Sequence, residues 1–107
     1  MIGVIEIGLL WYAHCIGDMI LQSKFMSDFK SKFWYPMFSH VFIWTSTISL
    51  VLSYLGIFTP TKFVFLFVGH WLMDAWKSRQ PKDDEHRWCM YVDQGWHFIQ
   101  LVIAGLF

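Results

Sequence analysis

The sequence predicts an all-α protein, an integral membrane four-helix bundle, on the strength of three observations. The chain has 107 residues, of which 56% are hydrophobic, 21% aromatic and only 15% charged, a composition far more apolar than that of an ordinary soluble domain. Polar blocks and turn residues divide it into four apolar segments. Each segment has about 18 to 22 residues, enough for a helix to cross a hydrocarbon core of about 30 Å. We therefore expect a single transmembrane domain over residues 1–107.

The first helix is expected over about residues 2–23, where the apolar run ends before Lys24. A cleaved signal peptide would have a basic N-terminal region and a small-residue cleavage pattern, and this run has neither. It also carries Glu6, His14 and Asp18 among its apolar residues. We therefore interpret it as a retained membrane helix.

The other three helices are expected over about residues 36–54, 60–77 and 89–107. Pro36 opens the second, because proline is favoured at the first helical position. Thr59, followed by a proline, resembles a cap and first turn for the third. The polar stretch "KSRQPKDDEHR" separates the third helix from the fourth, and its acidic residues are expected to be solvated and offset by the flanking basic ones.

Basic residues set the expected orientation. Seven of the eight lie in the two segments that join the first helix to the second and the third to the fourth, and Lys62 is the exception. By the positive-inside rule both segments are cytoplasmic, so the N-terminus and the C-terminus lie on the other side of the membrane. The formal net charge is zero, and no basic patch of the kind that binds nucleic acid is present.

Histidine and aspartate recur at one spacing inside the apolar runs, as "HCIGD", "HWLMD" and, reversed, "DQGWH". Residues four apart lie about 40° from each other around a helix and share a face. With helices running in alternating directions, all these residues fall within about two turns of the cytoplasmic interface. The candidate metal ligands are His14, Asp18, His40, His70, Asp74, Asp93 and His97.

A divalent metal ion is the partner that this cluster predicts. A charged group at the centre of a membrane helix costs about 2.5 to 3.5 kcal/mol on insertion scales, so several together imply a partner or an aqueous cavity. Imidazole and carboxylate ligands suit zinc, iron, nickel or manganese, of which zinc is the expected ion. Seven candidates exceed the four ligands of one tetrahedral zinc, so either two ions bind or some carboxylates orient the histidines around one ion. Hydrogen bonding between helices without a metal is the simpler alternative.

The stretch "HCIGDMILQSKFMSDFKSK", the isolated His40, "GHWLMDAWK" and "VDQGWH" together resemble the small phage and bacterial membrane proteins grouped as domain of unknown function 3307. The order of these motifs is specific, although each alone is not. The resemblance covers nearly the whole chain and implies a bacterial inner-membrane location. That family is in turn similar to membrane-bound metal-dependent hydrolases, which resemble all-helical zinc-dependent phospholipases C.

The favoured function is metal-assisted hydrolysis of a phosphoester or other ester at the cytoplasmic membrane face. Asp18, Asp74 and Asp93 are expected to be the catalytic carboxylates, as bridging ligands, orienting partners or the general base. An anionic, phosphate-containing substrate and membrane lipid are the expected partners. The expected substrate-binding residues, which include the matching glutamines of the family pattern, are Gln22, Lys30, Lys77 and Gln94.

Two other functions remain open. A proton or metal-ion transporter would need a polar path across the whole membrane, to which the outer-half residues Glu6, Thr47, Ser49, Ser53 and Gln100 could contribute. A non-catalytic phage-type membrane effector would use the polar residues only to hold its helices together. A bundle of this size can also form a homo-oligomer, but no small-residue face marks an interface.

Overall fold

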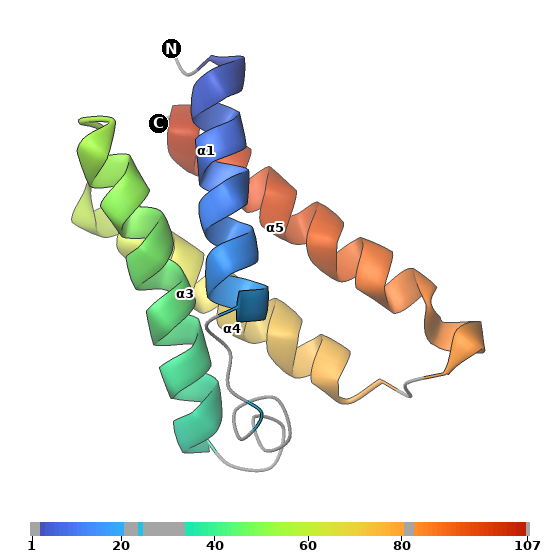
Figure 1. Cartoon of the computed structure of the whole chain (residues 1–107). Helices are drawn as coiled ribbons and strands as arrows, with labels where there is room; N and C mark the ends of the chain where they lie inside the picture. The colour runs from blue at the N-terminus through green and yellow to red at the C-terminus, as the bar shows by residue number, and fades with distance from the viewer. Residues whose placement is uncertain (1–2, 21–23, 25–33, 81–82, 107) are drawn as a thin grey trace.

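The structure, a computed structural model, describes residues 3–20, 24, 34–80 and 83–106. This part of the chain is helical and contains no strand, which confirms the all-α prediction (Figure 1). The described elements, in chain order, are the helices α1 (Val4–Cys15), α3 (Trp34–Tyr54), α4 (Pro60–Ser78) and α5 (Trp88–Leu106), with a π-helix η1 (Ile16–Ile20) after α1 and a 3₁₀ helix η2 (Asp84–His86) before α5.

The four long helices form a ring in which each packs on the next. α1 lies against α3, α3 against α4, α4 against α5, and α5 returns to α1. They alternate in direction, so both termini and the α3–α4 turn share one end of the bundle (Figure 1). We call this the terminal end, and the opposite end, where α3 begins and α4 ends, the loop end. The molecule measures 39 × 28 × 21 Å.

Local sequence explains where the helices begin. α3 is described from Trp34, so the helix already includes Trp34 and Tyr35 before Pro36, the residue expected to open it. α4 begins at Pro60, and the Thr59 hydroxyl caps it by accepting a hydrogen bond from the backbone N–H of Lys62 at 3.3 Å. Glycine at position 56 adopts a positive φ of 76° in the turn before α4, a conformation that glycine adopts without steric cost.

The η2 helix is an exposed turn in the segment that joins α4 to α5. The Asp83 carboxylate accepts hydrogen bonds from both the backbone N–H of His86, at 3.0 Å, and the His86 ring, at 2.7 Å. The bond with the ring lowers the pKa of Asp83 below its usual range. These residues are solvated or half-buried and stand apart from the buried polar cluster.

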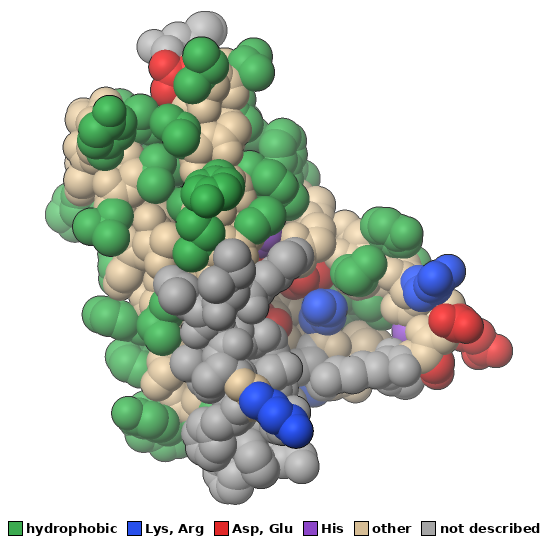
Figure 2. Space-filling view, viewed as in Figure 1, with side chains coloured by type: hydrophobic (Ala, Val, Ile, Leu, Met, Phe, Trp, Pro, Cys, Tyr) green, Lys and Arg blue, Asp and Glu red, His purple; other side chains and the backbone are tan. Residues whose placement is uncertain are grey.

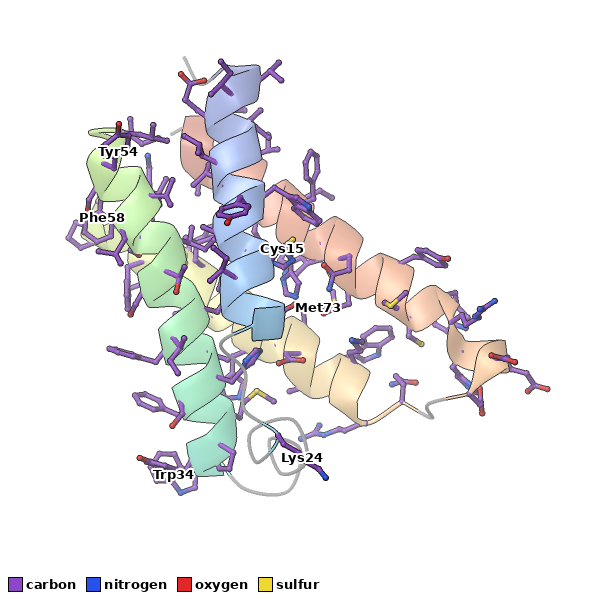
Figure 3. The ribbon with its side chains drawn as sticks, viewed as in Figure 1. Cys15, Lys24, Trp34, Tyr54, Phe58 and Met73 are labelled. Atoms are coloured by element: carbon purple, nitrogen blue, oxygen red, sulfur yellow. The ribbon has the colours of Figure 1, made fainter. Side chains whose placement is uncertain are left out.

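An apolar core fills the terminal half of the bundle. Its buried members come from all four long helices and are Leu10, Ala13, Trp44, Ile48, Leu52, Leu66, Leu101 and Ala104. Trp34 and Tyr54 mark the loop and terminal ends of α3 in Figure 3. Trp44 lies midway along the same helix, where the core meets the polar cluster described below.

Among the described residues, one helix is long and apolar enough to cross a membrane, namely Trp34–Tyr54. α4 and α5 have 19 residues each, but the polar side chains that they bury reduce their mean hydropathy. The outer faces are different: large apolar side chains such as Val4, Leu50 and Leu72 are 87%, 72% and 67% exposed. Figure 2 shows apolar side chains over the helices and charged ones gathered where α4 and α5 are joined.

Candidate metal centre

Four histidines, one from each long helix, meet in the loop half of the bundle. His14, His40, His70 and His97 are at most 1% exposed. The ring centroid of His70 lies 5.1 Å from that of His40 and 4.2 Å from that of His97, and the ring centroid of His14 lies 5.3 Å from that of His97. The three aspartates predicted beside them, Asp18, Asp74 and Asp93, contact these rings.

One group of ligand atoms forms between α3, α4 and η1. The Nε2 atoms of His40 and His70 lie 3.1 Å apart, and Oδ1 of Asp18 lies 3.2 Å from the first and 3.8 Å from the second. Oδ2 of Asp74 lies 3.0 Å and 3.9 Å from the same two nitrogens. Four polar atoms thus crowd around one point, and Asp18, His40 and His70 could hold a metal ion there. We call Asp18, His40, His70 and Asp74 the α4 group.

A second group lies beside α5 and consists of Asp18, Asp93 and His97, which could also hold a metal ion. Oδ1 of Asp93 and Nε2 of His97 are 3.0 Å apart and fully buried, yet neither has a hydrogen-bonding partner among the described residues. Buried polar atoms normally have a partner. Their 3.0 Å separation is short enough for both atoms to ligate one ion. We call this set the α5 group.

A chain of hydrogen bonds runs from Trp44 through His14 and Gln94 to a carboxylate in each group. The Trp44 indole N–H donates to Nδ1 of His14 at 2.9 Å, and because an indole can only donate, Nδ1 must be the acceptor. Neutral His14 then carries its proton on Nε2, which lies 2.8 Å from Oε1 of Gln94 and donates to it. The Gln94 amide in turn donates to Oδ2 of Asp93 at 3.0 Å and to Oδ2 of Asp18 at 3.5 Å.

This chain gives His14 and Gln94 specific places in the centre. Both ring nitrogens of His14 are occupied by protein partners, so ligation of a metal by His14 would require one of these bonds to break. Gln94 was expected to bind substrate, and in the structure it holds one oxygen of each of two carboxylates. No role was predicted for Trp44, although its position four residues after His40, on the same helix face, was the available signal.

Packing fixes the orientation of the ligand rings. The His70 ring stacks on Trp44, with centroids 4.1 Å apart, and on His97, with centroids 4.2 Å apart. Asp18 belongs to the π-helix η1, a distortion that often marks functional sites. Glycine at position 17 allows η1 to approach α3, since a Cβ there would lie 3.0 Å from Cα of Trp44.

Lys77 lies at the edge of the cluster. Its side chain is 36% exposed, and its ammonium group is 3.7 Å from Oδ2 of Asp93. Among the described residues, Lys77 therefore brings a positive charge to the edge of the cluster, next to Asp93. Gln22 and Lys30, also predicted to bind substrate, lie outside the described residues.

A known protein family matches the sequence over nearly its full length. The model of the family described as protein of unknown function (DUF3307) matches residues 7–107. The chain belongs to the DUF3307 family. No curated protein and no solved structure matches it significantly. All described residues of the candidate metal centre lie within the part of the chain that matches DUF3307.

Proposed function

We propose that this DUF3307 protein is a membrane-embedded, metal-dependent hydrolase that cleaves a phosphoester or other ester at the cytoplasmic membrane face. The observation that carries the proposal is the convergence of imidazole nitrogens and carboxylate oxygens from every long helix of the bundle. Apolar packing alone would place none of these groups together. A metal ion accounts for their common position.

The ligand distances fit a zinc-sized ion. Tetrahedral ligands at about 2.0 to 2.1 Å from zinc lie about 3.3 to 3.4 Å from one another. In the α4 group the three separations among Asp18, His40 and His70 are 3.1, 3.2 and 3.8 Å. A small contraction of the longest would bring these atoms to ligation geometry. The donor set of nitrogen and oxygen atoms also matches the preferences of zinc and similar divalent ions.

The distribution of polarity supports a membrane location. The bundle buries polar and charged residues such as His40, Asp74 and Asp93, while many large apolar side chains are exposed. A soluble domain has the opposite arrangement. Polar groups on the inner face reduce the mean hydropathy of a helix even when lipid contacts only its outer face. With the two basic segments in the cytoplasm, the loop end and its metal centre face the cytoplasmic side of a bacterial inner membrane.

The residues of the chain have separate tasks in such a reaction. A bound divalent ion would act as a Lewis acid and lower the pKa of a coordinated water toward about 7. The carboxylates of Asp18, Asp74 and Asp93 hold the ion or accept a proton from the attacking water. Lys77 attracts an anionic group at the exposed edge of the centre. The stacked aromatic rings exclude bulk water from the inner side.

The closed terminal half counts against a transporter. Leu10, Ile48, Leu52 and Leu66 are fully buried there. Of the polar residues that could line a path, Ser53 is exposed, and the Thr47 hydroxyl donates to the carbonyl of Ile43 in its own helix. Ser49, Lys62 and Gln100 are buried in the terminal half, but the buried histidines and aspartates all lie in the loop half. A non-catalytic effector is distinguished by its metal content, since it predicts that no metal survives purification.

Asp74→Asn tests the proposal, because asparagine keeps the volume of the side chain and removes its charge. We expect a loss of about 10 to 100-fold in metal affinity or activity. Bound metal is measured by elemental analysis of detergent-purified protein, and activity with a chromogenic phosphodiester, a chromogenic carboxylic ester and phospholipid vesicles. Asp84→Asn, whose side chain is 99% exposed, is the matched control. Normal metal content and activity in a folded Asp74→Asn protein would contradict the proposal.

A further inference from the structure

The α4 group and the α5 group share one residue, Asp18, and its two oxygens face different sides. Oδ1 lies 3.2 Å from Nε2 of His40 in the α4 group. Oδ2 accepts a hydrogen bond from Gln94 on α5, the side chain that also binds Asp93. We propose that the centre binds two divalent ions, one in each group, and that the Asp18 carboxylate bridges them. This inference rests on the proposed function, because it assumes that the cluster binds metal.

Each group brings three ligand atoms close enough together to bind its own ion. The ligand atoms of Asp18, His40 and His70 lie within 4.8 Å of one another, and so do those of Asp18, Asp93 and His97. Nε2 of His97 and Oδ1 of Asp93 are buried and lie 3.0 Å apart without a hydrogen bond, which is a second indication for the α5 group. If the α4 group alone bound an ion, this nitrogen and this oxygen would keep only each other as a polar neighbour and would make no hydrogen bond.

The hydrogen-bond chain prepares the α5 group for ligation. Gln94 donates to Oδ2 of Asp93 and so leaves Oδ1 directed toward His97. Trp44 and His14 fix the orientation of the Gln94 amide, with its oxygen toward His14 and its nitrogen toward the carboxylates. His14 is therefore a positioning residue in this centre, and the ligands of the second ion come from η1 and α5.

Charge indicates the class of substrate. Three carboxylates, partly offset by the Lys77 ammonium, are neutralised by one divalent ion, and a second ion makes the centre positive. A phosphomonoester, with two negative charges, would restore neutrality, and a phosphodiester, with one, would offset half of the positive charge; either could bind both ions, as in two-metal sites where the ions lie about 3.5 to 4 Å apart. The two-ion centre therefore favours a phosphoester over a neutral carboxylic ester.

Manganese alone is the probe for the experiment, which uses the full chain in detergent after chelation and reloading with Mn²⁺. We expect about two equivalents per chain and the electron paramagnetic resonance spectrum of an exchange-coupled pair, since a bridging carboxylate couples two ions at this separation. One equivalent with the six-line spectrum of an isolated ion would overturn the two-ion centre. That result leaves the hydrolase proposal standing if the one-ion protein hydrolyses a phosphodiester.

Substitutions then assign the ions to the groups. Asp93→Asn and His97→Gln should each halve the manganese content and give an uncoupled spectrum, because the α4 group remains intact. Asp18→Asn should abolish the coupling, whereas Asp84→Asn should change neither the content nor the spectrum. Retained coupling in a folded Asp18→Asn protein would overturn the bridge. A coupled pair in wild-type protein that hydrolyses none of the test esters would support the two-ion centre and contradict the proposed function.

Discussion

Leu66 and His70 lie one turn apart on α4 and are both fully buried, yet they belong to different halves of the bundle. Leu66 packs in the apolar core with Leu10, Ile48 and Leu101, where each contact stabilises the fold by itself. His70 lies among imidazoles and carboxylates that stabilise the bundle only if their lone pairs and charges find partners. The apolar half can therefore hold the helices together without the polar half, which makes the polar half available for chemistry.

The largest difference between the halves should appear when Leu66→Ala is compared with His70→Phe. Leu66→Ala leaves a cavity and should lower the free energy of unfolding by about 2 to 5 kcal/mol while metal content is retained. His70→Phe keeps a ring against Trp44 and His97 but removes a ligand of the proposed metal centre, so metal affinity should fall by more than about 100-fold. Unfolding with excess chelator and metal titration measure the two effects.

Chelator is essential to this comparison, because a bound ion itself stabilises the folded state. Without metal, His70→Phe should be as stable as wild type or more stable, since it replaces a buried polar ring by an apolar one. If His70→Phe destabilises the metal-free protein as much as Leu66→Ala does, both halves contribute equally to the stability of the fold, and the apolar half does not hold the helices together by itself.

A smaller effect is expected at the crossing of α4 and α5, where glycine at position 69 separates the two halves. A Cβ at this position would collide with the side chain of Gln100, which donates to the carbonyl of Phe65, while Trp96 donates to the carbonyl of Gly69. Gly69→Ala should therefore cost about 1 to 3 kcal/mol of stability.

Gly95→Ala is the matched control, because a Cβ there meets nothing within 4 Å and the higher helix propensity of alanine should raise stability by up to about 1 kcal/mol. Thermal unfolding in detergent compares the two variants. Equal effects of the two substitutions would show that the helix crossing is not tightly packed.

The smallest predicted effect concerns Trp44, which lies at the boundary and contributes to both halves. Trp44→Phe keeps most of the apolar contact and removes the indole N–H that donates to His14. Loss of this support should reduce metal affinity by about 10-fold, with a stability change of about 1 kcal/mol from the lost hydrogen bond. Metal titration measures the affinity, and an unchanged affinity would show that the chain through His14 and Gln94 does not orient the carboxylates.

The sequence predicts much of this arrangement because two of its signals are local. Apolar segment lengths and turn residues indicate the long helices, and histidine four residues from aspartate indicates a shared face. The π-helix η1 was not predicted, since no local pattern indicates it and the close approach of Gly17 to Trp44 on α3 is visible only in the structure. Nor does spacing distinguish a ligand from its support: His14 and His70 both precede an aspartate by four residues, but only the structure shows the Trp44 bond to His14.

The distribution of the ligands over the chain also sets an order of events during synthesis. Asp18 follows the first helix, while Asp93 and His97 belong to the last, so the α5 group does not exist until the ribosome has completed α5 and this helix has packed against α1. His40 and His70 meet earlier, when α3 and α4 pair. A growing chain can therefore assemble the α4 group first, and the α5 group forms only after the last helix has joined the ring.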